Sequence, residues 1–129
     1  MASARSISFT VITPEHQVLE ETSDAVTIPA CDGELGVLYH RAPLMCELGI
    51  GQLRYRKDGR MYRVYVDGGF AQVYQDQVTV LTSHAVPAEA ISDEMIADAR
   101  QAVEAAPDAE ARAQSARRLH TLQSLKSVV

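Results

Sequence analysis

The residues that could carry out chemistry are present, but their spacing brings no set of them together. The sequence has four histidines with no paired spacing typical of a zinc site and two cysteines that form no C-x-x-C, at His16, His40, His84, His120, Cys31 and Cys46. Its glycine pairs, Gly33-x-x-Gly36 and Gly49-x-Gly51, indicate turns rather than a Walker or dinucleotide loop. No serine has the strand-to-helix elbow of a nucleophile. Because an enzyme requires convergent titratable groups, we predict a non-catalytic protein without metal or cofactor.

Length, composition and charge narrow the class of protein. The chain has 129 residues, of which 47% are hydrophobic, as expected for one globular domain with or without an appendage. Its net charge of −5 argues against general nucleic-acid binding, which needs a basic surface. We expect both cysteines to be free, in a reducing compartment. The N-terminus lacks the apolar segment of a signal peptide, and no apolar run approaches the roughly 20 residues of a membrane span, so we expect membrane association only through a partner.

Residues 5 to about 85 have the pattern of short strands separated by turns. Ile7, Phe9 and Val11 alternate with mostly polar neighbours, and similar patterns rich in β-branched residues follow along the chain. An Asp-Gly pair at residues 58–59 is a hairpin signal. We count about nine to ten strands, with no helical pattern between them. This arrangement predicts an antiparallel β sandwich.

The composition changes beyond the last expected strand to Ala, Glu and Arg. Ser92 can cap a first helix, Pro107 ends it, and Asp108 can cap a second. One stripe on each helix is expected to face inward: Ile91, Met95, Ala99, Ala102 and Ala106, then Ala109, Ala113, Ala116, Leu119, Leu122 and Leu125. We therefore expect two units, a β sandwich over residues 1–86 and an antiparallel helical hairpin over residues 87–129. Because alanine buries little area, the hairpin should pack closely but weakly.

Charge separates the two expected helices. Residues 89–110 hold seven acids and one base, whereas residues 111–129 hold four bases and no acid. The four bases are Arg112, Arg117, Arg118 and Lys126. When the two helices are folded together, the acidic helix faces the basic one. When they separate, the basic helix can contact another acidic surface. The alternative, that these charges are only solvated faces of a stable hairpin, stays equally open, because an exposed ion pair contributes about 0–1 kcal/mol.

One stretch, residues 33–44, combines glycines, a carboxylate and a proline. Gly33 and Gly36 bracket Glu34, and the pair predicts a tight backbone reversal because glycine takes a positive φ without penalty. Pro43 has no N–H, which places it at a strand start or a sheet edge. On its residues alone, the stretch predicts a hairpin connection.

Four stretches of the sequence resemble, in the same order, motifs of the epsilon subunit of F-type ATP synthases. They are residues 11–15, like a first strand and turn, residues 33–44, similar to the GELG and APL elements, residues 65–73, with a GGF motif, and residues 77–82, similar to a VTVL strand. A sandwich followed by a helical hairpin is also the architecture of that subunit. The resemblance covers nearly the whole chain and depends on the shared order of the motifs.

The resemblance implies a non-catalytic part of the rotor, peripheral to the cytoplasmic face of the inner or plasma membrane. One face of the sandwich would pack on the gamma subunit, and its end loops would meet the ring of c subunits. Thr13, Glu34 and Arg41 match the ring-facing positions, and His40 is expected beside them. The hairpin would fold on the sandwich, or open along gamma and block ATP hydrolysis with its basic helix against an acidic segment of the catalytic beta subunit.

The sequence departs from the family pattern at two places. Tyr39-His40-Arg41 stands where Pro-Gly-His is usual, so the histidine is displaced by one position and the freedom of the glycine is expected to be lost. Some members bind ATP between the helices through a motif with an arginine, but Ile96 stands at that position. Without the arginine a phosphate loses its bidentate partner, so we expect no ATP binding by the hairpin.

A second interpretation places the chain in another functional class, as a freestanding β-sandwich ligand-binding or adaptor module. In that case the helices cap an open sheet edge, and the chain should be a monomer with a concave apolar pocket. Deleting the helices separates the two hypotheses. A rotor subunit should keep a folded sandwich that binds its partner, whereas a freestanding module should lose its stability.

Overall fold

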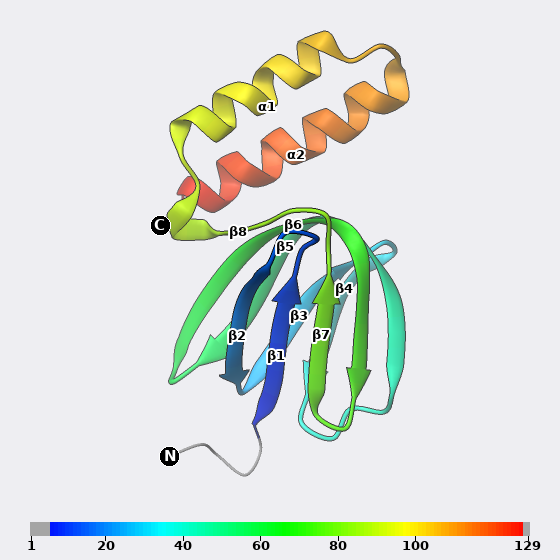
Figure 1. The fold of residues 1–129 in the computed structure, drawn as a ribbon, viewed down its shortest axis with the longest axis vertical. Coiled ribbons are helices and arrows are strands. Elements are labelled where there is room, and N and C mark those ends of the chain that lie inside the picture. Colours follow the sequence, from blue (N-terminus) through cyan, green and yellow to red (C-terminus); the bar gives the residue numbers. More distant parts are fainter. Residues whose placement is uncertain (1–5, 128–129) are drawn as a thin grey trace.

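The computed structural model describes residues 6–127, in which the strands come first and two helices form a hairpin above one end of the sheet (Figure 1). The strands are β1 (Ile7–Ile12), β2 (Gln17–Ser23), β3 (Ala25–Ala30), β4 (Gly33–Leu38), β5 (Leu44–Lys57), β6 (Arg60–Tyr74), β7 (Gln77–Leu81) and β8 (Ala85–Pro87). A 3-10 turn, η1 (Ala88–Ala90), leads to the helices α1 (Asp93–Ala105) and α2 (Ala109–Ser127).

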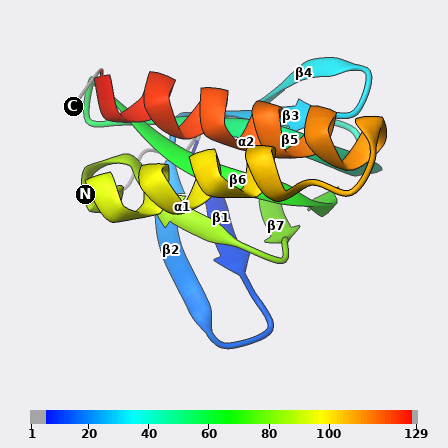
Figure 2. The ribbon, with the colours of Figure 1, turned by 90° about the horizontal axis from the view of Figure 1, so that it is seen from above.

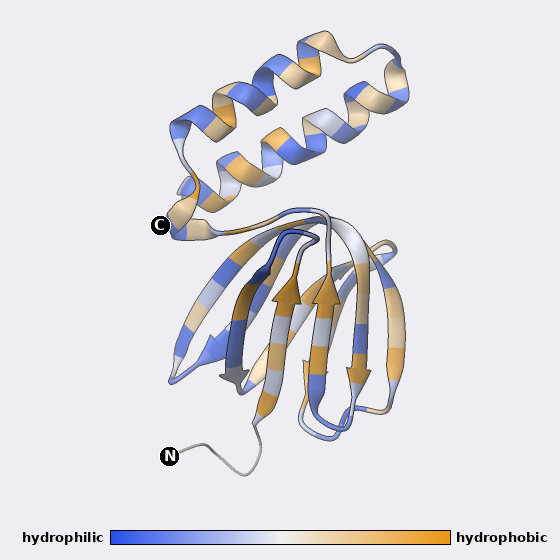
Figure 3. Cartoon of the chain, viewed as in Figure 1, coloured by the Kyte–Doolittle hydropathy of each residue, from blue (hydrophilic) through white to orange (hydrophobic). Residues whose placement is uncertain are grey.

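Hydrophobic and hydrophilic residues alternate along most strands (Figure 3), and hydrophobic residues at buried positions form the interior of the sandwich. Ile7, Phe9 and Val11 are fully buried in β1, as the sequence predicts. They belong to a cluster of fifteen buried residues drawn from β1, β3, β4, β5, β6 and β7. The ring of Phe9 lies 4.9 Å from the ring of Tyr55 across this core. Val, Ile and Leu supply most of the cluster, so its stability rests on the area of apolar surface removed from water.

The described residues form eight strands rather than nine or ten, because two pairs of expected strands are continuous. β5 and β6 are antiparallel along nearly their whole length, from the pair Leu44↔Val73 to the pair Lys57↔Arg60. The glycines at 49, 51, 68 and 69, which suggested breaks in the sequence, lie inside these long strands. The turn between β5 and β6 is the predicted Asp-Gly turn, with both residues at positive φ.

The strand order is β2-β1-β7-β6-β5-β3-β4, with β8 paired to β6. The predicted β-sandwich class is confirmed, and all pairs are antiparallel except β1 with β7, which is parallel. This exception has a topological reason. β1 and β7 are connected through five intervening strands rather than by a hairpin, so a hairpin does not force the two to run in opposite directions.

β6 changes its partner in the middle of its length. Residues 70–74 pair with β7, whereas residues 64–66 pair with β8. Between these segments Gly68 and Gly69 have φ of 71° and 105°, values that favour glycine. A Cβ on Gly69 would lie 1.9 Å from the carbonyl oxygen of Leu81, so the end of β7 approaches the β6 backbone at a distance that only glycine permits.

The helices begin and end where the sequence predicts. The hydroxyl of Ser92 accepts a hydrogen bond from the N–H of Met95 at 3.2 Å, and the carboxylate of Asp108 accepts one from the N–H of Ala111 at 2.8 Å. Pro107 lies in the turn between the two helices.

The inward faces of the helices are confirmed only in part. In α2, Leu122 and Leu125 are buried, but Ala109, Ala113 and Ala116 are exposed, and Ser115 is buried instead. In α1 the less exposed positions are Ile96, Ala99 and Val103, while Met95 and Ala102 are exposed. Alanine fits either face of a helix because it buries little area, so the alanine pattern did not fix the orientation.

A second apolar cluster joins the hairpin to the sheet. It consists of the buried residues Tyr65, Ala88, Ile91, Leu122 and Leu125, with Ile50, Val86, Ile96 and Ala99 packed around them. Seen from above, α2 lies over β5 and β6, and α1 lies beside α2 (Figure 2). No residue of α1 is buried, so α1 depends on α2 and on this cluster for its attachment.

Replacement of Gly69 by alanine should destabilise the fold strongly. The added Cβ meets the carbonyl of Leu81, and alanine is strained at this φ, so we expect a loss of about 3 kcal/mol or more in the free energy of unfolding. Urea denaturation measures this loss. Gly36→Ala is the control, since no heavy atom lies within 4 Å of its Cβ, and it should change stability by less than about 0.5 kcal/mol. Equal stabilities of the two variants would contradict the close approach.

Candidate partner-binding surfaces

Thr13 closes the turn between β1 and β2. Its side chain is buried, and its hydroxyl donates a hydrogen bond to the carbonyl of His16 at 3.1 Å. The N–H of Thr13 bonds the same carbonyl at 3.0 Å. The structure therefore gives Thr13 a role in shaping the turn, and the neighbouring residues 14–16 are the exposed ones.

Glu34 lies near the start of the edge strand β4 and pairs with Arg54 of β5. The guanidinium donates two hydrogen bonds to the carboxylate, at 2.6 and 3.1 Å, in a bidentate arrangement. This contact lowers the pKa of Glu34 below its ordinary value. The Glu34 side chain is 54% exposed, so the pair is accessible from outside. The bracket of glycines is only half as predicted, because Gly33 has a positive φ whereas Gly36 lies inside β4.

His40 and Arg41 lie in the loop between β4 and β5, and both are exposed. His40 has a φ of 66°, in the left-handed region that favours glycine. Its N–H donates to the carboxylate of Asp76 at 2.6 Å, and the N–H of Arg41 donates to the carbonyl of Leu38 at 3.1 Å. A histidine held by Asp76 therefore adopts here the left-handed backbone that a glycine would take, without the freedom of a glycine.

The four expected ring-contact residues do not form one surface. The N–H of His40 donates to the side chain of Asp76, and the carbonyl of Asp76 accepts from the N–H of Ser8, near the start of β1. Thr13 instead follows the last residue of β1. At about 3.3 Å per residue, the six residues of β1 separate these ends by roughly 20 Å. Figure 1 shows the β1–β2 and β3–β4 turns toward the helices and the β4–β5 loop at the opposite end.

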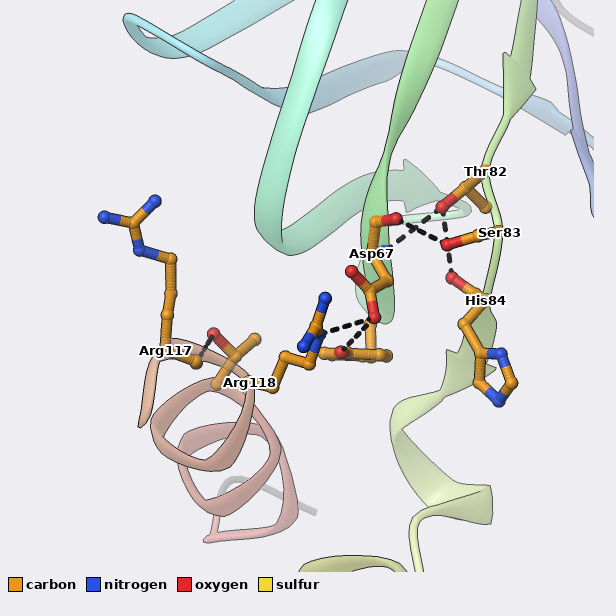
Figure 4. Close-up of polar contacts among 8 residues, drawn as sticks. Asp67, Thr82, Ser83, His84, Arg117 and Arg118 are labelled. Atoms are coloured by element: carbon orange, nitrogen blue, oxygen red, sulfur yellow. Dashed lines mark hydrogen bonds and ion pairs between the residues drawn. The ribbon is translucent and has the colours of Figure 1, made fainter. Parts of the chain in front are cut away.

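The four basic residues of α2 divide into two pairs. Arg118 donates from Nε to the carboxylate of Asp67 at 2.9 Å, and Lys126 lies 3.2 Å from the carboxylate of Asp93. Arg112 and Arg117 are exposed and have no carboxylate within ion-pair distance among residues 6–127. Figure 4 shows the side chain of Arg117 directed away from Asp67 and that of Arg118 directed toward it.

An apolar patch that the sequence analysis missed lies on the outer face of β5, β6 and β7. Met45, Phe70 and Leu81, called here the β5–β6–β7 patch, are 66%, 54% and 51% exposed. Phe70 stands directly opposite Leu81, and Met45 is diagonal to Phe70 across β5 and β6. A signal for this patch was present in the sequence. Phe70 and Leu81 are large apolar residues directly beside the buried Ala71 and Val80, so alternation along the strand turns them outward.

The thiols and histidines form no visible centre in the described part of the chain. Within residues 6–127, no group of three or more His, Cys, Asp or Glu side chains is arranged to hold a metal ion. Cys31 and Cys46 are free, as predicted. Burial raises the pKa of the Cys46 thiol, and partial desolvation together with the Glu47 carboxylate raises the pKa of the exposed Cys31 thiol, which disfavours a reactive thiolate. No helix in the same range is long and apolar enough to cross a bilayer.

Comparisons with known proteins agree with the sequence resemblance. The family described as ATP synthase, delta/epsilon chain, beta-sandwich domain, matches residues 6–88. The ATP synthase epsilon chain of Symbiobacterium thermophilum is 45% identical over 107 residues, which are 82% of this chain and 73% of that one. The chain therefore belongs to the class of ATP synthase delta/epsilon chains, whose beta-sandwich domain spans most of its length.

Two solved structures extend the comparison. A chain in the Euglena gracilis mitochondrial ATP synthase, OSCP/F1/c-ring structure has a TM-score of 0.74 and 29% identity, covering 99% of this chain and 83% of that one. A chain in the Tetrahymena thermophila mitochondrial ATP synthase central stalk and c-ring structure shares the fold, with a TM-score of 0.64 at 12% identity and 95% coverage of both chains. The protein belongs to the ATP synthase epsilon-chain family.

The Arg54 contact should be visible in the titration of Glu34. Because pairing lowers the folded-state pKa, the stabilisation by this pair is present at neutral pH and is lost as the pH falls through that lowered value. In an NMR titration of the carboxyl carbons, Arg54→Gln should raise the pKa of Glu34 toward its ordinary value. Arg56→Gln is the control: it removes an exposed charge two residues away on β5 and should leave the pKa of Glu34 low. If both variants gave the same pKa, the bidentate contact would not be its cause.

Proposed function

We propose that the chain is a non-catalytic rotor-stalk subunit that links the gamma subunit of an F-type ATP synthase to its ring of c subunits. Membership of the epsilon-chain family supports this role, as do the c-ring assemblies in which similar chains occur. On this proposal the chain is peripheral to the cytoplasmic face of the membrane, held there through the c ring, and needs no cofactor or nucleic acid.

The β5–β6–β7 patch is the observation that carries the docking of gamma. Three large apolar side chains stand together on an open sheet face that the hairpin does not cover. Soluble proteins rarely leave such clusters exposed unless a partner covers them. The polar residues that follow on β7 and β1, including Ser8, Thr10 and Gln77, would form the rim of this contact.

The c ring would meet the end of the sandwich that carries the β3–β4 turn. Two exposed carboxylates lie at this turn, Asp32 and Glu34, the second of them paired with Arg54. An acidic end suits basic residues in the polar loops of a ring. The exposed turn at residues 14–16 lies toward the same end. His40 and Arg41 lie at the other end and would contact a different part of the complex.

The hairpin would act as the movable, inhibitory element. Arg112 and Arg117 are exposed and have no acidic partner in the described chain, so they are the basic residues available to the acidic segment of a catalytic beta subunit. Arg118 and Lys126 become available only after the hairpin leaves the sheet. ATP would not bind between the helices, because Ile96, at the position of the phosphate-binding arginine, packs into the cluster beneath α1.

Phe70→Glu tests the docking face. The charge would lie in the centre of the proposed contact and would have to be desolvated, so we expect binding to the gamma subunit to weaken at least about tenfold in a titration of purified subunits. Met61→Glu is the matched control. Like Phe70, Met61 is a large apolar residue of β6, and it is 44% exposed but lies outside the patch. Equal loss of affinity in both variants, or no loss in Phe70→Glu, would contradict docking through this face.

Removal of residues 88–129 tests the division of roles between sandwich and hairpin. The fifteen-residue core lies entirely in the strands, so the shortened chain should stay folded by circular dichroism and bind gamma with little change. Inhibition of ATP hydrolysis by the complex should weaken, because the basic helix is gone. An unfolded truncated chain would favour the freestanding module instead. A folded chain that leaves hydrolysis unchanged would remove the inhibitory role alone.

A further inference from the structure

Asp67 connects the bend of the sheet to the hairpin. Its N–H donates to the hydroxyl of Thr82 and to the carbonyl of His84, both at 3.1 Å, and its carbonyl accepts from the hydroxyl of Ser83 at 2.9 Å. These bonds fix the backbone beside Gly68, where β6 changes partner (Figure 4). The position of the carboxylate is therefore set by the strands before any helix contacts it.

The carboxylate of Asp67 holds α2. One oxygen, Oδ2, accepts hydrogen bonds from the hydroxyl of Tyr65 at 3.2 Å and from Nε of Arg118 at 2.9 Å. The side chains of Arg118 and Asp67 are 39% and 18% exposed, so this charge-assisted bond is better shielded from water than a surface pair. Arg118 also interacts with the hydroxyl of Tyr65, the other β6 side chain at this carboxylate. Within residues 6–127, every other ion pair of α1 or α2 stays within the hairpin and its base, and none reaches a strand.

The rest of the seam between helices and sheet is thin. Among residues 6–127, five buried residues form its apolar cluster, compared with fifteen inside the sandwich. A hollow of about 310 Å³ lies beside the ion pair, lined among others by Tyr65, Met95 and Leu122. Because the apolar seam is small, loss of one shielded charge pair should weaken it measurably.

Lys126 makes a different kind of contact. Its ammonium group lies 3.2 Å from the carboxylate of Asp93 and donates to the carbonyl of Ile91 at 3.3 Å. Both partners belong to the start of α1 and the residues before it, so this contact joins the end of α2 to the base of the hairpin and does not involve a strand. It can persist when the hairpin leaves the sheet.

We propose that the Asp67–Arg118 pair is the latch that keeps the hairpin on the sandwich, whereas Lys126 keeps the two helices together. Release of the latch then detaches the hairpin as a closed pair of helices, before the helices separate from each other. This inference rests on the proposed movable hairpin. It states that the carboxylate of Asp67 on β6 is what keeps the hairpin attached to the sheet.

Two distances measured by pulsed electron paramagnetic resonance separate these contacts in the isolated full-length chain. Spin labels are attached to cysteines in a chain whose two native cysteines are replaced by serine. Labels at Gln72 and Gln114 report the distance between sandwich and hairpin, and labels at Ala97 and Gln123 report the distance between the helices. All four positions are exposed, so the labels should not disturb the core.

Arg118→Gln should broaden the sandwich–hairpin distance and leave the interhelix distance narrow. We expect the ratio of detached to attached molecules to rise about tenfold, the size that loss of one charge-assisted hydrogen bond implies. Arg117→Gln is the matched control, with the same loss of charge one residue away, and should change neither distance. Lys126→Gln should broaden the interhelix distance. A result for Arg118→Gln equal to that for Arg117→Gln, or broadening of both distances together, overturns the proposal.

Asp67→Asn provides a second test of the pair, because it keeps the size of the side chain and the backbone bonds. It should broaden the sandwich–hairpin distance as Arg118→Gln does, and the double variant should show no more than the larger single effect. Additive effects would overturn the latch. Since these measurements use the isolated chain and docking is tested with Phe70→Glu, failure of the latch and failure of the proposed role give different results.

Discussion

The structure depends on the close approach between the backbone of β6 at Gly69 and the end of β7. This contact lets one continuous ribbon, β5 with β6, pair with β7 through one half and with β8 and the hairpin through the other. The outer face beside β7 stays open and carries the apolar patch, while the face around Tyr65 is covered by α2. A bend in two strands therefore creates two surfaces of different kinds on one small sheet.

Much of this fold was predictable because its signals are local. Alternation placed Ile7, Phe9 and Val11 in the core, and Ser92 and Asp108 marked the helix starts through hydrogen bonds that only short polar side chains make. The strand count was overestimated because glycine can bend a strand as well as interrupt it, and only the register of the partner strand distinguishes the two. The parallel pair of β1 and β7 is likewise a property of the whole chain path.

The candidate surfaces were less predictable, since they depend on which strand ends meet in space. Thr13, Glu34 and Arg41 were grouped through one resemblance, yet Thr13 and Arg41 lie toward opposite ends of the sandwich. The patch was missed because Phe70 and Leu81 were counted as strand residues, and the sequence does not say which face of a strand is covered. Asp67 was read as part of a glycine motif, and its connection to Arg118 spans 51 positions in the chain.

The backbone at His40 has a consequence for how this family varies. A left-handed residue is normally glycine, but here a histidine adopts φ of 66° while its N–H is held by the carboxylate of Asp76, itself left-handed at 62°. A flexible residue and a clamped residue are thus two solutions to one backbone requirement. Positions 40 and 76 should covary among relatives, glycine at the first relieving the need for an acceptor at the second.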